Sequence, residues 1–75
     1  MILIDVRTPD EYKTGHYPNA VNHELDRFMQ GDFPDVSQDT EIQVYCRSGN
    51  RSGIAKQLLE KNGFTHVINI GAYNR

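Results

Sequence analysis

Three short apolar runs, separated by stretches of helical pattern, constrain the fold of this chain most strongly. Residues 1–6 are apolar apart from Asp5, residues 42–45 form a second β-favouring run, and residues 67–70 form a third. The first run is typical of a strand buried on both faces of a parallel sheet, whereas the second alternates, with Gln43 and Tyr45 between Ile42, Val44 and Cys46. Strands that alternate with helices are joined by right-handed crossovers. We therefore predict a small α/β domain with a parallel β-sheet and helices on both faces.

The segment after the first run carries a helix start signal. Thr8 is placed as the N-cap, Pro9 at the first helical position, and Glu11 closes a capping box. This short helix is expected to end at Gly15. The remaining segments are predicted as a very short strand at 20–22, a helix at 24–30, a surface loop at 32–40 and a helix at 52–62.

Length and charge limit the classes of function. The 75 residues predict one domain, residues 1–75, near the lower limit of what folds alone. The net charge is −2 with acidic and basic residues interspersed, so no nucleic-acid or membrane-surface partner is expected. Neither a membrane span nor a signal peptide is evident. We expect a monomer in the cytoplasm as the chain stands, or in the periplasm if a signal peptide was removed.

The only cysteine, Cys46, lies where the second apolar run ends, just before the longest predicted helix. A loop between a strand and a helix N-terminus directs consecutive backbone N–H groups to one point, where an anion is favoured. If that anion is the Cys46 thiolate, its pKa falls and it becomes a nucleophile at neutral pH. The alternative is a buried structural cysteine. The flanking arginines and Gly49 favour the reactive thiol.

The residues that follow Cys46 have separate candidate roles. Gly49 allows a tight turn with its N–H pointing inward. Arg47 and Arg51 are either solvated surface residues or a source of positive potential that stabilises the thiolate and attracts an anionic substrate. Ser52 either caps the helix or donates to a bound oxyanion. Cys46 is thus the candidate catalytic residue, and the candidate substrate- and anion-binding loop is Arg47, Ser48, Gly49, Asn50, Arg51 and Ser52.

Two motifs carry a resemblance to a known family. The first is Cys46-Arg-Ser-Gly-Asn-Arg-Ser52. The second comprises Asp5-Val-Arg7, Glu11-Tyr12 and Gly15-His-Tyr-Pro-Asn-Ala-Val-Asn22. Both resemble signatures of the rhodanese (thiosulfate sulfurtransferase) family, and together they span nearly the whole chain. The chain is identified as a member of this family, most similar to the single-domain phage shock protein E type.

The resemblance implies both a topology and a reaction. The strand order would be 20–22, 1–6, 42–46, 67–70. Sulfane sulfur would pass from thiosulfate to cyanide or a thiol acceptor through a Cys46 persulfide, by double displacement and without a metal or organic cofactor. The spacing Cys46-x4-Arg51 suits a single sulfur atom. Related folds that hydrolyse phosphate esters or reduce arsenate carry one more loop residue.

Two other functions are also compatible with the sequence. A rhodanese-like sulfur carrier or binding module would accept sulfur without efficient turnover, and a cysteine-based phosphatase or arsenate reductase is disfavoured by the loop length. The family's N-terminal strand and helix are missing before Ile4, and Gly71-Ala72 replaces the usual Gly-Gly near the end. We therefore expect a shallow, open pocket.

Several charged and histidine residues are expected to hold the fold. We predict an ion pair between Arg7 and either Glu11 or Asp5 that orients the first strand and helix. The three histidines have no metal-ligand spacing, so no metal site is expected. His16, which lies in the second motif, is expected to be structural. A catalytic pair of Cys46 with a histidine is possible on composition alone. These histidines are His16, His23 and His66.

Overall fold

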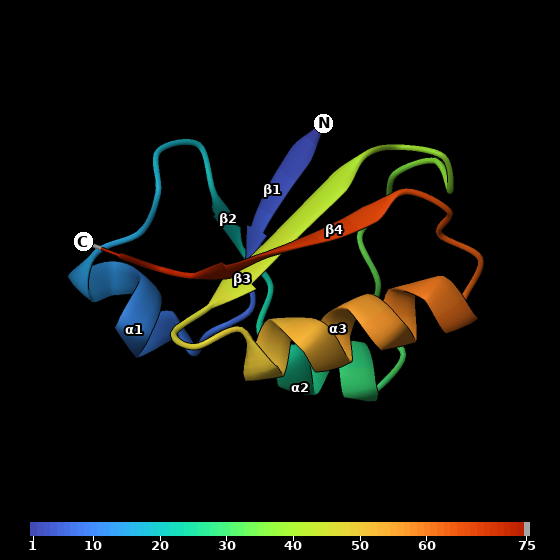
Figure 1. Cartoon of the computed structure of the whole chain (residues 1–75). Coiled ribbons are helices and arrows are strands. Elements are labelled where there is room, and N and C mark those ends of the chain that lie inside the picture. Colours follow the sequence, from blue (N-terminus) through green and yellow to red (C-terminus); the bar gives the residue numbers. More distant parts are fainter. Residues whose placement is uncertain (75) are drawn as a thin grey trace.

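The structure, a computed structural model, describes residues 1–74 and contains a four-stranded parallel sheet (Figure 1). The spatial order of the strands is β2-β1-β3-β4, and all three pairings are parallel. The strands are β1 (Ile2–Asp5), β2 (Val21–Asn22), β3 (Ile42–Cys46) and β4 (Val67–Ala72). The α/β class and the expected strand order are confirmed.

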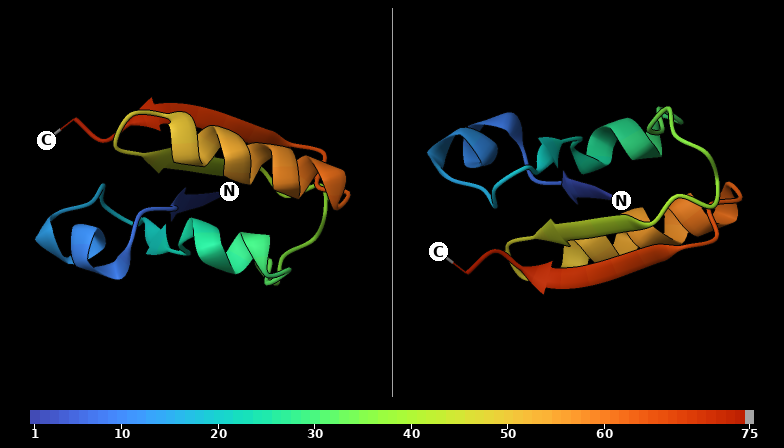
Figure 2. Two further views of the ribbon diagram at one scale, coloured as in Figure 1. Left: turned by 90° about the horizontal axis from the view of Figure 1, so that it is seen from below. Right: turned by 90° about the horizontal axis from the view of Figure 1, so that it is seen from above.

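The helices are α1 (Pro9–Thr14), α2 (Leu25–Met29) and α3 (Asn50–Lys61). Helices α2 and α3 lie on the same face of the sheet and contact each other (Figures 1 and 2). The steps from β2 to β3, across β1, and from β3 to β4 run in the same direction, so right-handed crossovers place both helices on one side. The short α1 buries no residue and lies at the carboxyl end of the sheet. Helices α2 and α3 therefore cover one face of the sheet.

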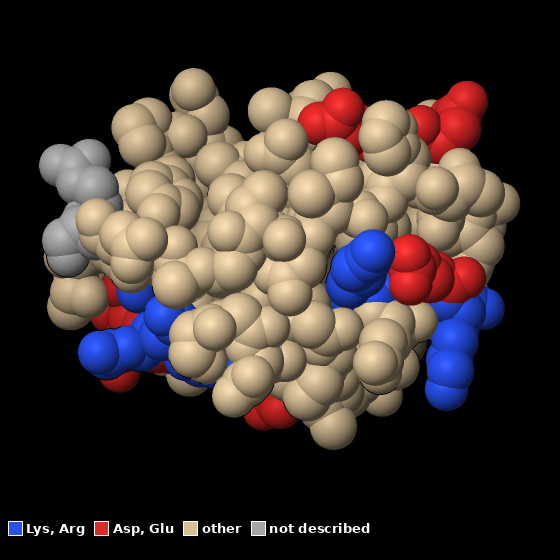
Figure 3. All heavy atoms as spheres, viewed as in Figure 1, with Lys and Arg blue, Asp and Glu red and all other residues tan. Residues whose placement is uncertain are grey.

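The core lies between the sheet and the pair α2 and α3. Alternate strand residues point into it and meet apolar side chains from the two helices. The buried cluster is Ile4, Val6, Phe28, Ile42, Val44, Cys46, Ala55, Leu59, Phe64 and Val67. On the other face, Ile68 and Ile70 are 38% and 42% exposed. The surface over β4 is largely free of charged side chains (Figure 3).

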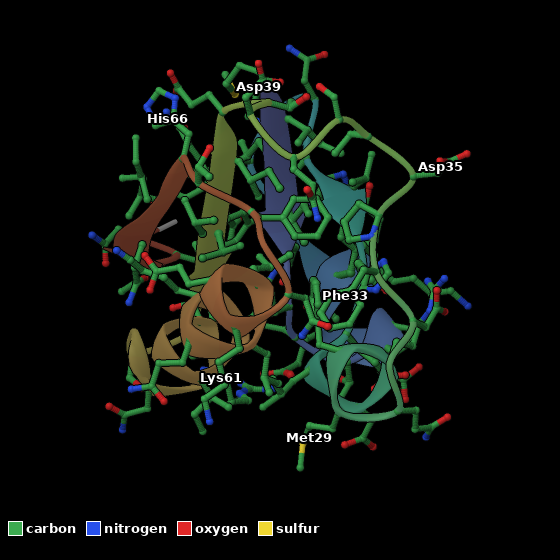
Figure 4. The ribbon with its side chains drawn as sticks, turned by 90° about the vertical axis from the view of Figure 1, so that its right-hand side faces the viewer. Met29, Phe33, Asp35, Asp39, Lys61 and His66 are labelled. Atoms are coloured by element: carbon green, nitrogen blue, oxygen red, sulfur yellow. The ribbon has the colours of Figure 1, made fainter. Side chains whose placement is uncertain are left out.

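The 32–40 loop closes the core at the amino ends of the strands. Phe33 turns inward, with its ring 5.8 Å from the ring of Phe28 and 6.2 Å from that of Phe64 (Figure 4). Met29 and Lys61 point outward in the same view. No helix within residues 1–74 is long and apolar enough to cross a bilayer.

The two largest differences from the predicted element boundaries are of two residues each, and both lie beside Cys46. Helix α3 begins at Asn50 with Gly49 as its N-cap, so Ser52 lies inside the first turn and is not the cap. Strand β4 continues to Ala72 because a bulge interrupts its pairing with β3: Val44 pairs with Asn69 and Tyr45 with Gly71. Ile70 is the extra residue of this bulge, and pairing resumes at Gly71 and Ala72, two residues beyond the predicted end of the strand.

Candidate active site

Cys46 is the last residue of β3, at the carboxyl end of a central strand. In open parallel α/β sheets this end is where ligands bind. The chain turns at residues 47–49 and enters α3 (Figure 1). Cys46 is a free thiol and only 1% exposed. Its sulfur is therefore held inside the loop.

Backbone N–H groups and a hydroxyl surround this sulfur. The Gly49 N–H donates to Sγ at 2.9 Å, and the Ser52 hydroxyl lies 3.5 Å from Sγ. Burial raises the pKa of the Cys46 thiol. Hydrogen bonds from the Ser52 hydroxyl and from the N–H groups of Ser52, Ser48 and Gly49 outweigh it and lower the pKa to about 7. About half of the molecules would then carry a thiolate at neutral pH.

The two loop arginines lie in different surroundings. Arg51 forms a two-pronged ion pair with Glu11, with nitrogen–oxygen distances of 2.8 and 3.0 Å. Hydrogen bonds from Arg51 outweigh the effect of burial and lower the pKa of Glu11 to about 2. Arg47 is exposed. The charge of Arg51 is thus balanced by a carboxylate from α1, and Arg47 lies on the rim.

Arg7 forms its ion pair with Asp5, one of the two partners expected. Its guanidinium donates to both carboxylate oxygens of Asp5 at 2.7–3.0 Å and to the Gly15 carbonyl at 2.6 Å. Asp5 is fully buried, and the guanidinium carbon lies 4.6 Å from the centre of the Tyr73 ring. Through this buried pair, β1 contacts Gly15 at the start of the 15–20 segment and Tyr73 near the end of the described residues.

His16 and His23 lie in backbone contacts, and His66 Nε2 lies 3.9 Å from Glu41 Oε1. His16 stacks on Tyr12 at 3.6 Å and its Nδ1 lies 2.8 Å from the Tyr12 carbonyl, which fits a structural residue. His23 Nε2 lies 2.7 Å from the Asp32 carbonyl. Over residues 1–74, no histidine hydrogen-bonds to Cys46, and no cluster of His, Cys, Asp and Glu side chains could hold a metal ion.

Sequence reasoning missed two residues that contact the loop. Glu11 was assigned to the α1 cap alone or to Arg7, and its capping box with Thr8 is present, yet it also binds Arg51. The sequence pattern places Asn69 only within a strand, although its side chain bonds to both Ser52 and Gly49. A polar residue at a helix-facing position of an apolar strand was the available signal for Asn69.

A small pocket lies beside Arg51, between the start of α1 and the start of α2. Its volume is about 110 Å³, and Val6 and Leu25 supply apolar walls. Thr8, Glu24 and Asp26 complete the lining together with Arg51. The pocket can hold only a small group next to the Arg51–Glu11 pair.

Comparisons with known proteins agree with the resemblance. The chain is 41% identical over 71 residues to the thiosulfate sulfurtransferase PspE of Escherichia coli, covering 91% of this chain and 66% of that protein. It is 34% identical to the putative sulfur carrier protein YrkF of Bacillus subtilis, with coverages of 91% and 36%. The chain therefore spans two thirds or less of these relatives' lengths.

The fold comparison gives the same result. A solved structure described as a rhodanese with anions from E. coli superposes with a TM-score of 0.81 at 35% identity, covering 95% of this chain and 85% of that one. The pattern that defines the rhodanese-like domain matches residues 1–74. On this match, over nearly its whole length, the chain belongs to the rhodanese-like family.

Proposed function

We propose that the protein is a sulfurtransferase that carries sulfane sulfur from thiosulfate to cyanide or a thiol through a persulfide on Cys46. The observation that carries the proposal is the loop around Sγ, where N–H groups and a hydroxyl lower the pKa of the only cysteine to about 7. The same loop, residues 47–52, is proposed to bind the anionic donor. The similarity to PspE, a thiosulfate sulfurtransferase, supports the choice of donor.

The proposed reaction has two displacements. The Cys46 thiolate attacks the outer sulfur of thiosulfate, a sulfur–sulfur bond forms on Sγ, and the sulfur–sulfur bond of thiosulfate breaks to release sulfite. The acceptor, cyanide or a thiolate, then attacks the terminal sulfur and regenerates the Cys46 thiolate. The persulfide is anionic, so the N–H groups that hold the thiolate also suit the intermediate.

Loop length supports sulfur transfer over phosphate chemistry. Arg51 follows Cys46 with four residues between them, and Gly49 already places its N–H 2.9 Å from Sγ. A cradle this tight suits one sulfur atom better than a tetrahedral phosphate. Catalysis of phosphate-ester hydrolysis is therefore not proposed.

A sulfur carrier is the second candidate. The similarity to YrkF, a putative sulfur carrier protein, and the 1% exposure of Cys46 favour it. A carrier would form the persulfide but would pass it slowly to small acceptors. The two candidates thus share the first displacement and differ in the second.

Thiocyanate formation from thiosulfate and cyanide tests the proposal. We expect turnover with parallel double-reciprocal plots, which indicate a double displacement, and no turnover in Cys46→Ser, because serine has no accessible anion at neutral pH. Circular dichroism would establish that this variant is folded. Persulfide formation without turnover would support the carrier instead. Hydrolysis of p-nitrophenyl phosphate without persulfide formation would overturn both.

A further inference from the structure

Asn69 lies on β4, outside the loop proposed to bind substrate, yet it joins three segments around Cys46. Its Oδ1 accepts a hydrogen bond from the Ser52 hydroxyl at 2.7 Å and another from the Gly71 N–H at 2.9 Å. Its Nδ2 donates to the Gly49 carbonyl at 3.2 Å. The amide thus contacts the first turn of α3, the N-cap of α3 and the bulge of β4.

The register of β4 explains why Asn69 can reach these groups. Asn69 pairs with Val44, so its side chain points to the same face as Cys46 and α3. Its bond to the N–H two residues ahead is the local turn that asparagine side chains favour. The amide packs beside Gly53 of α3, where an added Cβ would lie 3.6 Å from Nδ2, an ordinary van der Waals contact.

Ser52 has one hydroxyl proton and two acceptors within reach, Asn69 Oδ1 at 2.7 Å and Cys46 Sγ at 3.5 Å. The shorter bond holds the hydroxyl in the orientation that leaves its oxygen beside the sulfur. Without it, the hydroxyl is free to rotate to another staggered position, which would take it away from Sγ. When Cys46 ionises, the charged sulfur becomes the stronger acceptor and the proton rotates from Asn69 Oδ1 to Sγ, while Oδ1 keeps its bond from the Gly71 N–H.

We propose that Asn69 is a positioning residue that holds the Ser52 hydroxyl against the Cys46 sulfur. Asn69 does not touch the sulfur and acts through Ser52, while its bond to the Gly49 carbonyl steadies the loop. The inference deepens the proposed sulfur transfer. Its main readout, ionisation of the thiol, does not require that reaction, so the two ideas can fail separately.

The test measures the pKa of Cys46 from the pH dependence of alkylation by iodoacetamide. We expect Asn69→Ala to raise this pKa by about half a unit, a threefold loss of thiolate below the pKa, because a hydrogen bond to a charged sulfur is lost. Asn69 is exposed, so its replacement opens no cavity. Asn62→Ala is the matched control, since Asn62 also bonds a backbone carbonyl, Leu58, at 2.8 Å, but at the far end of α3.

A double-mutant cycle tests whether Asn69 acts through Ser52. In the Ser52→Ala background, the shift caused by Asn69→Ala should fall to less than half of its value in the parent protein. An equal shift in both backgrounds would overturn the proposal, as would an unchanged or lowered Cys46 pKa in Asn69→Ala. A rise in Asn62→Ala as large as in Asn69→Ala would show a general effect of stability and would also overturn it.

Discussion

Gly49 offers the sharpest perturbation of the loop around Cys46. Its φ of +97° lies in the region that L-residues rarely adopt, and its N–H is the nearest backbone donor to Sγ, at 2.9 Å. An alanine at this position costs about 1–2 kcal/mol of conformational strain. The loop can relieve that strain by rotating the peptide, which would take the N–H away from the sulfur.

The expected effect on Cys46 follows from the loss of that bond. A hydrogen bond to a charged group contributes about 1.5–3 kcal/mol, and 1.36 kcal/mol corresponds to one pKa unit. In Gly49→Ala the pKa of Cys46 should therefore rise from about 7 to about 8–9. At pH 7 the thiolate fraction falls from about half to about a tenth or less.

Gly31→Ala provides the matched control. Gly31 also has a positive φ, +85°, and an added Cβ there would meet no atom within 4 Å. Both substitutions should lower the free energy of unfolding by a similar amount, but only Gly49→Ala should change the absorbance titration of the thiolate. A folded Gly49→Ala protein with an unchanged Cys46 pKa would refute the argument that backbone N–H groups hold the thiolate.

Three further predictions concern charged groups around the sheet. Arg51→Ala should raise the KM for thiosulfate about tenfold. Glu11→Gln should lower this KM at low salt, because the Arg51 charge is no longer paired. Steady-state kinetics in which both variants shift the KM in the same direction would contradict this. Asp5→Asn should cost about 3 kcal/mol in urea unfolding because it leaves the buried Arg7 guanidinium uncompensated, and a cost below about 1 kcal/mol would contradict it. Burial lowers the pKa of His23, so its contribution to stability is present above about pH 6.5 and is lost as the pH falls. The free energy of unfolding in urea should therefore fall between pH 7 and pH 5, and it should fall less in His23→Gln. An equal fall in both proteins would contradict this.

The sequence was sufficient for features that depend on neighbouring residues. The apolar runs identified three of the four strands, and Thr8 with Glu11 identified the start of α1, because strand patterning and capping are local. The place of Cys46 at the end of β3 followed from the same local pattern. The strand order came from the family resemblance and is confirmed.

Long-range side-chain contacts could not be predicted in this way. Glu11 and Arg51 are 40 residues apart, and their ion pair depends on where α1 lies relative to α3. The contact between Asn69 and Ser52 depends on the register of β4 against β3 and on how α3 packs on the sheet. Local patterns specify elements, whereas these contacts arise from how the elements pack.

The mass of the intact protein after incubation with thiosulfate tests the central claim most directly. If the loop activates Cys46 for attack on sulfane sulfur, the protein should gain about 32 Da, the mass of one sulfur atom. The gain should map to Cys46, disappear on addition of cyanide and be absent in Cys46→Ser. An unchanged mass in a folded protein whose Cys46 titrates at about 7 would show that a thiolate is present but does not accept sulfur. That result would contradict the account.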